Sequence, residues 1–182
     1  MRKVFLIRHC QATGQEPEAP LTDKGREQAN DLLEFFKDEE IDRIVSSPYI
    51  RAVDSIRAFA ELKSVKVEID NRLSERVLSP VSLHDWEKHL FHSFEDMDYK
   101  IEGGESSREA MIRGISCLHE LLGGDGQQAI IVSHGNLISL MLKHYNKQIG
   151  FSDWKALSNP DIYELTFDNN QYKNMRRVWR DA

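Results

Sequence analysis

The chain is poor in the features that mark membrane, secreted and repeat proteins. Its 182 residues include only two cysteines, Cys10 and Cys117, which lie far apart in the sequence. This spacing excludes a disulfide framework and predicts a reduced, cytoplasmic protein. No apolar run approaches the ~20 residues that span a bilayer, and the run at 4–7 is too short for the core of a signal peptide. The sequence also lacks repeats, low-complexity tracts and linkers rich in proline or serine.

Basic charge is also in short supply. Lys and Arg total 24 against 30 for Asp and Glu, which gives a formal net charge of -6. Proteins that bind nucleic acid or membrane surfaces are normally basic, so we expect neither partner. The length and the 40% hydrophobic content fit one domain of ordinary size with a real core. We therefore expect a single domain over residues 1–182.

The hydrophobic pattern predicts strands that alternate with helices. The expected strands cover 3–8, 41–46, 65–69 and 129–133, with a closing pair at 161–167 and 172–179 around an Asp-Asn-Asn turn. Five helices are expected. The first begins after Thr22 as its N-cap, and the second begins at Ser47-Pro48. The third lies around 82–92, the fourth covers 105–122, and the fifth includes 137–142. In the second of these helices, we expect Ile50 among the buried residues.

Alternation of this kind predicts an α/β protein, a three-layer α/β/α sandwich around a mainly parallel sheet. The closing pair of strands is expected to be antiparallel or to lie at an edge. Ligands of such sheets bind beyond the carboxyl ends of the strands. The residues that matter should therefore follow the first, second and fourth strands.

Arginine and histidine occupy all three of those positions. Arg8 and His9 follow the first strand, Arg51 lies one helical turn after Ser46-Ser47-Pro48, and His134 follows the fourth strand. One such residue at a strand end is usually structural, but four cations together are a poor way to stabilise a core. They suit a phosphate dianion, because arginine offers a planar fork of donors and helix N-termini add free N–H groups.

Five segments together resemble the histidine phosphatase superfamily, the phosphoglycerate mutase-like proteins. They are Leu-Ile-Arg-His-Cys-Gln-Ala-Thr at 6–13, Pro-Leu-Thr-Asp-Lys-Gly-Arg-Glu-Gln-Ala at 20–29, Ser-Ser-Pro-Tyr-Ile-Arg-Ala at 46–52, Gly-Gly-Glu-Ser at 103–106 and Val-Ser-His-Gly at 132–135. The resemblance covers nearly the whole chain and implies the phosphoglycerate mutase-like fold. Each motif is short, but their ordered set is specific.

The expected chemistry is phosphoryl transfer through His9. A neutral imidazole is a competent nucleophile near pH 7, and the resemblance assigns His9 the same role as a transient phosphohistidine. Arg8, Arg51 and His134 would hold the phosphoryl oxygens. The N–H of Gly135 or Asn136 is a further candidate donor. We expect no metal and no other cofactor.

The resemblance places the proton donor at Glu75, after the third strand. A competing interpretation is that Glu75 only pairs with Arg72 or Arg76 on the surface. Glu105 is the second candidate, although at a helix start it would serve equally as a favourable first-turn charge.

Two positions depart from the family pattern. Cys10 stands where glycine usually follows the nucleophilic histidine, and a side chain there is expected to crowd the phosphate or alter the backbone. Gln15 stands where an asparagine usually contacts the phosphoryl group, and its amide is expected to make the same contact from a longer stem. Neither change removes a charge, so we expect activity to survive.

Two other chemistries fit the sequence poorly. Cysteine-based phosphatases need an arginine six positions after the cysteine, and those positions hold Glu16 and Gly123. A metal site is a weaker candidate at His84, His89 and His92 with the nearby acids, because no familiar zinc spacing appears. His119 and His144 are expected to be surface or packing residues.

Three functions remain open: a phosphatase acting on a small phosphomonoester, a phosphoglycerate mutase-type phosphoryl transferase, and a non-catalytic phospho-ligand binder. Only about 30 residues separate Glu75 from Gly104, so a large lid is not expected, which favours hydrolysis. We expect the segment 72–104 to form a flap over the pocket. Its aromatic residues, Trp86, Phe91, Phe94 and Tyr99, are expected to pack more than to bind. The chain is expected to act as a monomer or a homodimer.

Overall fold

A six-stranded sheet forms the centre of the computed structural model, which describes residues 1–179. Its order is β3-β2-β4-β1-β5-β6. The strands are β1 (Arg2–Arg8), β2 (Arg43–Ser46), β3 (Val67–Ile69), β4 (Gln128–Ser133), β5 (Asp161–Asp168) and β6 (Gln171–Arg177). The first four are parallel, while β5 runs antiparallel to β1 and β6 antiparallel to β5. The predicted fold class is confirmed, with the closing pair at one edge.

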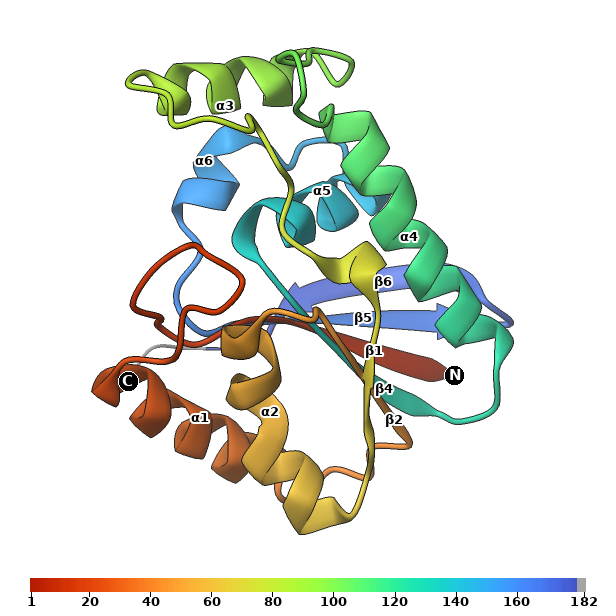
Figure 1. Ribbon diagram of the computed structural model, residues 1–182. Coiled ribbons are helices and arrows are strands. Elements are labelled where there is room, and N and C mark those ends of the chain that lie inside the picture. The colour runs from red at the N-terminus through yellow and green to blue at the C-terminus, as the bar shows by residue number, and fades with distance from the viewer. Residues whose placement is uncertain (180–182) are drawn as a thin grey trace.

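Helices cover both faces of this sheet (Figure 1). On one face lie α1 (Asp23–Phe36) and α2 (Ile50–Lys63), and on the other α4 (Ser107–Gly123) and α5 (Gly135–Tyr145). Further out on the second side lie α3 (Trp86–Glu95) and α6 (Phe151–Lys155). Alternate residues of β1 serve the two cores, since Phe5 and Ile7 face α1 and α2 while Val4 and Leu6 face α4 and α5.

Local signals explain several element boundaries. Thr22 caps α1 as predicted, because its side chain accepts a hydrogen bond from the Gly25 N–H. The predicted Asp-Asn-Asn turn joins β5 to β6, with positive φ at Asn169 and Asn170. Ser106 and Glu109 form a reciprocal capping box that starts α4 at Ser107.

The helix α2 begins three residues later than predicted. Ser47 is engaged in the turn, since its Oγ accepts the Tyr49 N–H at 3.3 Å, and Tyr49 keeps an extended backbone as N-cap. The first helical residue, Ile50, is 40% exposed, so the expectation of a buried Ile50 was wrong. Ser47 therefore lies before the helix, close to the carboxyl end of β2.

Other differences are smaller. The helix α3 begins at Trp86 instead of near 82, and α4 excludes Glu105 because Ser106 is the cap. A short 3-10 helix (Asn71–Leu73) and α6 were not predicted, because three and five residues are too few to show a period. Within residues 1–179, no helix is both long and apolar enough to cross a bilayer.

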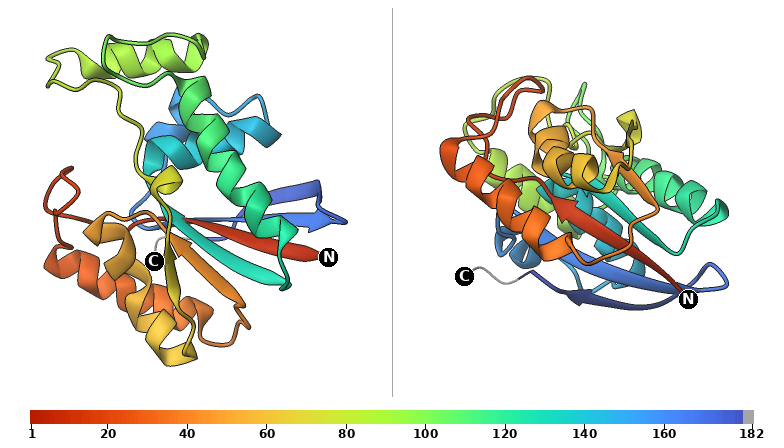
Figure 2. Two further views of the ribbon diagram at one scale, coloured as in Figure 1. Left: turned by 45° about the vertical axis from the view of Figure 1, so that its right-hand side comes forward. Right: turned by 90° about the horizontal axis from the view of Figure 1, so that it is seen from below.

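The parallel register gathers the predicted strand ends at one edge. Arg8 pairs with Ser133, and Ser46 pairs with Val132, so β1, β2 and β4 end side by side. The segment 72–104 leaves this edge, rises to α3 and returns to the start of α4 (Figure 2). The chain after β1, β2 and β4 therefore faces the underside of that segment.

Candidate active site

The predicted histidines and arginines do converge. The rings of His9 and His134 lie 5.1 Å apart, and the Arg51 Nε donates to the His9 Nε2 at 3.2 Å. These residues follow three different strands and are brought together by the parallel register of the sheet. The cluster is nearly closed to solvent, with His9 8% exposed and Arg51 fully buried.

Two hydrogen bonds define the tautomer of His9. Its Nδ1 lies 2.7 Å from the Cys10 carbonyl oxygen, which only accepts, so Nδ1 must carry the proton. The Nε2 accepts from Arg51 and therefore holds the free lone pair. That nitrogen is the one that a nucleophilic role requires.

Burial keeps His9 neutral. Desolvation is the main cause that lowers the pKa of His9 to about 3, and the positive charges of Arg51 and Arg8 lower it further. The bond to the Cys10 carbonyl opposes this shift without reversing it. The imidazole is therefore unprotonated at neutral pH.

Both arginines are held by main-chain carbonyls. The Arg51 Nη1 donates to the Glu16 oxygen at 2.8 Å, and its guanidinium lies 4.9 Å from the centre of the Tyr49 ring. The Arg8 Nη1 donates to the Leu157 oxygen at 3.0 Å. Burial lowers the pKa of both guanidinium groups, and the charge of Glu75 partly offsets this. Carbonyl partners orient the two cations without neutralising them.

Several buried side-chain nitrogens at this edge have no partner within residues 1–179: Arg8 Nε, Arg51 Nη2 and His134 Nδ1. An unsatisfied buried donor costs about 1–3 kcal/mol, more when charged. The two arginine donors beside the His9 imidazole mark a site that an anion with several oxygens would satisfy.

Ser47 orients His134. Its Oγ lies 2.7 Å from the His134 Nε2, and the same oxygen already accepts the Tyr49 N–H. A hydroxyl oxygen can accept two hydrogen bonds as well as donate one, so this contact fits either tautomer of the His134 ring. Burial, followed by the nearby His9 and arginines, lowers the pKa of His134 well below its usual value.

Glu75 binds the start of α5. Its two carboxylate oxygens accept the Asn136 and Leu137 N–H groups, each at 3.0 Å. A carboxylate at a helix N-terminus is favoured by the helix dipole. Of the two candidate main-chain donors, Gly135 and Asn136, the Asn136 N–H is therefore already engaged by Glu75, while the Asn136 side chain lines the cleft.

The side chains of the competing partners for Glu75 are engaged elsewhere, although the Arg76 main-chain N–H donates to the Glu75 Oε1 at 2.8 Å. Arg72 pairs with Asp70 and Glu120. Arg76 donates to the Glu105 carbonyl at 3.0 Å and to the Ser93 hydroxyl at 2.7 Å. The interpretation of Glu75 as a surface ion-pair partner of these arginines was therefore wrong.

Glu105 has a structural position. Its carboxylate forms a two-pronged ion pair with Arg113, at 2.6 and 2.9 Å. Arg113 also donates to the Arg72 and Ser74 carbonyl oxygens, at 2.7 and 2.8 Å. The pair thus anchors the chain immediately before Glu75.

The two departures from the family pattern behave differently. Cys10 is fully buried in the core beneath α1 and α2, its N–H donates to the Ser55 Oγ at 2.8 Å, and burial raises its pKa to about 12. The expectation that its side chain crowds the phosphate site was therefore wrong. Gln15 is exposed and lines the cleft, which agrees with its expected position.

The absence of a side chain at Gly135 allows the Arg8 guanidinium to pack closely against it. A Cβ at this position would lie 3.1 Å from the Arg8 Cζ and Nε, closer than side chains normally pack. The guanidinium therefore lies directly against the start of α5, where glycine permits the approach.

Sequence reasoning missed the loop that links α6 to β5. The Asn159 Nδ2 donates to the His9 carbonyl at 2.8 Å. Asp161, 1% exposed, accepts the Ser158 N–H and forms an ion pair with Arg177. The Asn-Pro pair at 159–160 signals a turn, but only the β1·β5 pairing shows that this turn lies beside His9.

A cleft of about 640 Å³ opens above the cluster. Arg8, Arg51 and Glu75 line one part, and Trp86 and Trp154 line another. Of the four aromatic residues expected to pack, Trp86 instead lines the cleft. The expectation is confirmed for the other three: Phe94 is buried, Phe91 packs on Phe151, and Tyr99 stacks on His89.

The histidines outside this site form no metal cluster. In the described part of the chain, no group of three or more His, Cys, Asp or Glu side chains is placed to hold an ion. His89 bonds to the Tyr99 hydroxyl and lies 3.2 Å from Asp85. The rings of His119 and His144 pack edge to face, 6.2 Å apart, as expected for packing residues.

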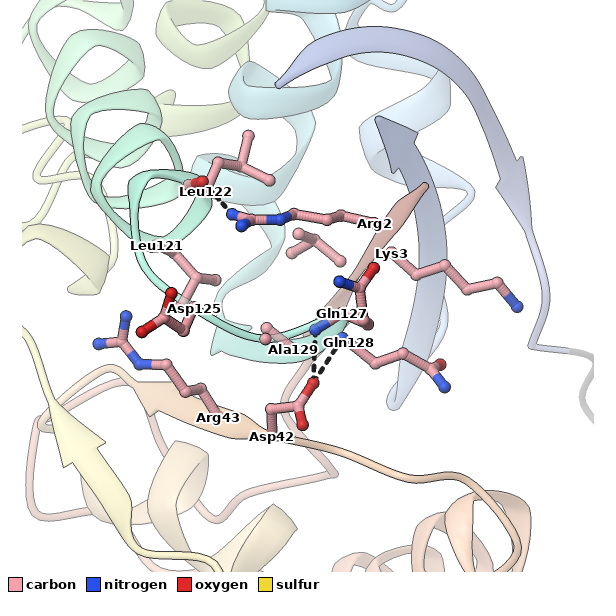
Figure 3. Close-up of a pocket in the computed structure, with 12 residues that line it drawn as sticks. Arg2, Lys3, Asp42, Arg43, Leu121, Leu122, Asp125, Gln127, Gln128 and Ala129 are labelled. Atoms are coloured by element: carbon pink, nitrogen blue, oxygen red, sulfur yellow. Dashed lines mark hydrogen bonds between the residues drawn. The ribbon is translucent and has the colours of Figure 1, made fainter. Parts of the chain in front are cut away.

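A second, much smaller pocket lies at the opposite, amino end of β1 and β4 (Figure 3). Its volume is about 20 Å³. Arg2 reaches the Leu122 carbonyl there, and Asp42 accepts the Gln127 and Gln128 N–H groups at 2.6 and 2.9 Å. Arg2 and Asp42 thus already have main-chain partners in this pocket.

Several known proteins are similar to this chain in sequence. A probable phosphoglycerate mutase of an Enterobacter species is 28% identical over 153 residues, covering 74% of this chain and 70% of the relative. A glucosyl-3-phosphoglycerate phosphatase of Mycolicibacterium vanbaalenii is 27% identical over 168 residues, covering 78% and 72%.

Solved structures share the fold at lower identity. A mycobacterial glucosyl-3-phosphoglycerate phosphatase superposes with a TM-score of 0.77 at 24% identity, covering 97% of both chains. A phosphoserine phosphatase of Entamoeba histolytica gives 0.77 at 21% identity, covering 98% of this chain and 96% of the other. The family model described as histidine phosphatase superfamily (branch 1) matches residues 4–180. The chain therefore belongs to the histidine phosphatase superfamily.

Proposed function

We propose that the protein is a metal-independent phosphomonoesterase that hydrolyses a small phosphorylated substrate through a phosphohistidine on His9. One observation carries the proposal: two arginines that each keep an unpartnered buried N–H lie with His134 beside an imidazole whose ring lone pair is on Nε2. The donors supply the positive charge that phosphoryl oxygens need, and Nε2 supplies the electron pair. The relatives named as phosphatases and as a mutase support phosphate chemistry.

The first half-reaction forms a phosphorus–nitrogen bond. The Nε2 of His9 attacks phosphorus while the bond to the ester oxygen breaks. Arg8, Arg51 and His134 hold the three phosphoryl oxygens, and Arg51 exchanges its bond to Nε2 for a bond to the phosphoryl group. Glu75 enters this step in its protonated form, and its proton converts the departing alkoxide to an alcohol, which leaves Glu75 as a carboxylate.

The second half-reaction returns the enzyme to its starting state. Glu75 now accepts a proton from water, and the resulting hydroxide displaces the phosphoryl group from Nε2. Inorganic phosphate leaves, and the His9 lone pair is restored. Because the Nδ1–H bond to the Cys10 carbonyl is kept throughout, the imidazole stays aligned.

The proposal assigns the segment 72–104 to covering the cleft within a single domain. It contributes Glu75 at its start and Trp86 near its middle, and both line the cleft. We place the enzyme in the cytoplasm as a monomer or a homodimer, with Gln15 and Asn136 as further substrate contacts through their side chains.

The test is release of p-nitrophenol from p-nitrophenyl phosphate in the presence of EDTA. Wild type is expected to turn over and orthovanadate to inhibit it, whereas His9→Ala is expected to be inactive. The exposed variant His84→Ala serves as the matched control and should keep full activity. Sensitivity to EDTA, or activity in His9→Ala, would contradict the proposed mechanism. A wild type inactive on all phosphomonoesters would indicate a mutase or a binding protein.

A further inference from the structure

The cleft is far larger than one phosphoryl group needs. Its volume of about 640 Å³ is within the range of about 300–1,000 Å³ that holds whole organic ligands. Arg8, Arg51 and Glu75 account for the part where the phosphoryl group is proposed to bind. The remaining wall must therefore face the rest of the substrate.

That remaining wall is apolar. Val77, Leu78, Val81 and Leu83 line it, together with two tryptophans. The Val81 side chain is 65% exposed, although contact with water does not stabilise an apolar side chain. Exposed apolar surface gathered in a cleft is typical of a binding site for an organic group.

The charges of the cleft are concentrated at its phosphate end. Of the described residues that line it, four are charged: Arg8, Arg51, Glu75 and Arg76. Arg76 is only 5% exposed, and its Nε and Nη1 already donate to the Glu105 carbonyl and the Ser93 hydroxyl. Its Nη2 has no partner in the described chain, so Arg76 is the one cation of the described lining outside the proposed phosphate site, and its burial limits its contact with a second negative charge on the substrate.

Two indoles form the most distinctive part of this wall. Trp86 comes from the first turn of α3 and Trp154 from α6, and their rings meet edge to face with centroids 6.2 Å apart. Trp86 remains 46% exposed beside the cleft. Each indole has a flat apolar face, and the two perpendicular rings together form an apolar corner against which an aromatic ring packs well.

We propose that Trp86 and Trp154 form the leaving-group subsite and select phosphomonoesters of uncharged, aromatic alcohols. The inference rests on the proposed phosphatase function and adds the substrate class. Phosphorylated short carboxylic acids are disfavoured, because Arg76, the one cation of this part of the described lining, is only 5% exposed and already donates through Nε and Nη1. The two tryptophans are specificity residues and take no part in bond breaking.

The test compares three esters with the same kind of primary alkyl leaving group: benzyl phosphate, ethyl phosphate and phosphoglycolate. Wild type is expected to show a kcat/KM for benzyl phosphate about tenfold or more above that for ethyl phosphate, with phosphoglycolate the poorest. Trp86→Ala and Trp154→Ala should each remove most of the benzyl preference through KM, and leave ethyl phosphate within about twofold. Trp86→Phe should restore it.

Phe91→Ala is the matched control. Phe91 lies on the same helix as Trp86 and is similarly exposed, at 50%, but does not line the cleft. It should leave all three values unchanged. Equal kcat/KM values for benzyl and ethyl phosphate in wild type would overturn the inference. So would a preference for phosphoglycolate that Arg76→Met abolishes, since Arg76 Nη2 is buried without a partner in the described chain.

Failure of the proposed function gives a different result. If none of the three esters is hydrolysed, that function is contradicted, and calorimetric titration with benzylphosphonate and ethylphosphonate then decides the subsite. Tighter binding of benzylphosphonate, lost in Trp86→Ala, would support the subsite. Equal binding of the two phosphonates would overturn it.

Discussion

The two ends of the parallel sheet treat their charged residues in opposite ways. At the amino end, Asp42 holds two backbone N–H groups and Arg43 pairs with both oxygens of Glu68. At the carboxyl end, Arg8 and Arg51 keep buried donors without partners in the described chain. The amino end uses its charges to stabilise the fold, whereas the carboxyl end keeps positive charge available.

This difference separates stability from function within one sheet. A satisfied ion pair at a surface contributes about 0–1 kcal/mol and has nothing left to offer a ligand. Unsatisfied buried cations cost stability and are retained where an anion must bind. A substitution at the carboxyl end should therefore lower the rate more than the stability, and a substitution at the amino end should lower the stability more than the rate.

The largest contrast is expected between Arg51 and Arg43. Arg51→Met should lower kcat/KM for p-nitrophenyl phosphate by about 10²–10³-fold, because it removes a donor to the phosphoryl oxygens. Arg43→Met should leave kcat/KM unchanged and lower the free energy of unfolding by less than about 1 kcal/mol. Steady-state kinetics and urea unfolding of both variants check this. Equal losses of rate would remove the distinction between the two ends.

The next contrast is between two glutamates near the cleft. Glu75→Gln should slow turnover of an alkyl phosphate by about 10²-fold and change the pH profile of kcat. Its effect should be smaller with p-nitrophenyl phosphate, whose leaving group needs less help from an acid. Glu105→Gln loosens the ion pair with Arg113 and should lower thermal stability more than rate. A loss independent of the leaving group would exclude Glu75 as the proton donor.

The loop before β5 should show a positioning effect. Asn159→Ala removes the bond to the His9 carbonyl and should lower kcat by about tenfold with KM little changed. Ser158→Ala is the control, because its hydroxyl bonds to the Pro160 carbonyl within the same loop. If both variants lose the same activity, the effect belongs to the loop as a whole and not to the Asn159 amide.

Much of the site could be predicted because it depends on strand ends. Arg8, His9 and His134 directly follow apolar strands, and parallel pairing brings such ends together whatever the loops do. The partners of Glu75 could not be predicted, since they depend on the path of 72–104 toward α5. Asn159 was missed because its place beside His9 comes from the antiparallel register of β5.

The direction of individual side chains was the other limit. Cys10 directly follows His9, yet its side chain lies in the core beneath α1 and α2 while His9 meets Arg51 and His134. Sequence shows only that the two residues are adjacent. Trp154 was missed because α6 has five residues, too few for a helical period.

Titration of His9 should appear in stability. Its pKa is lowered to about 3 from a usual value of 6.5, so between these values the unfolded chain binds a proton that the folded protein does not. The contribution to the free energy of unfolding is complete above pH 6.5 and is lost on acidification, by about 1.4 kcal/mol per pH unit. The free energy of unfolding of wild type minus that of His9→Ala, measured by urea unfolding, should therefore fall from pH 6 to pH 4. A constant difference would contradict the neutral buried imidazole.

The smallest effect is expected at the amino end. Asp42→Ala frees two backbone N–H groups and should cost about 1 kcal/mol of unfolding free energy. Asp42→Asn keeps an acceptor and should cost less. Both should leave kcat/KM at the wild-type value. A change in rate would show that the two ends are coupled.

The central claim is that His9 carries the phosphoryl group, and rapid-quench trapping tests it most directly. Enzyme mixed with ³²P-labelled substrate and quenched in alkali, where phosphohistidine survives, is digested and mapped. The account predicts acid-labile label on the peptide that contains His9, and none in His9→Ala. Label on another residue, or turnover with no labelled protein at any quench time, would contradict it.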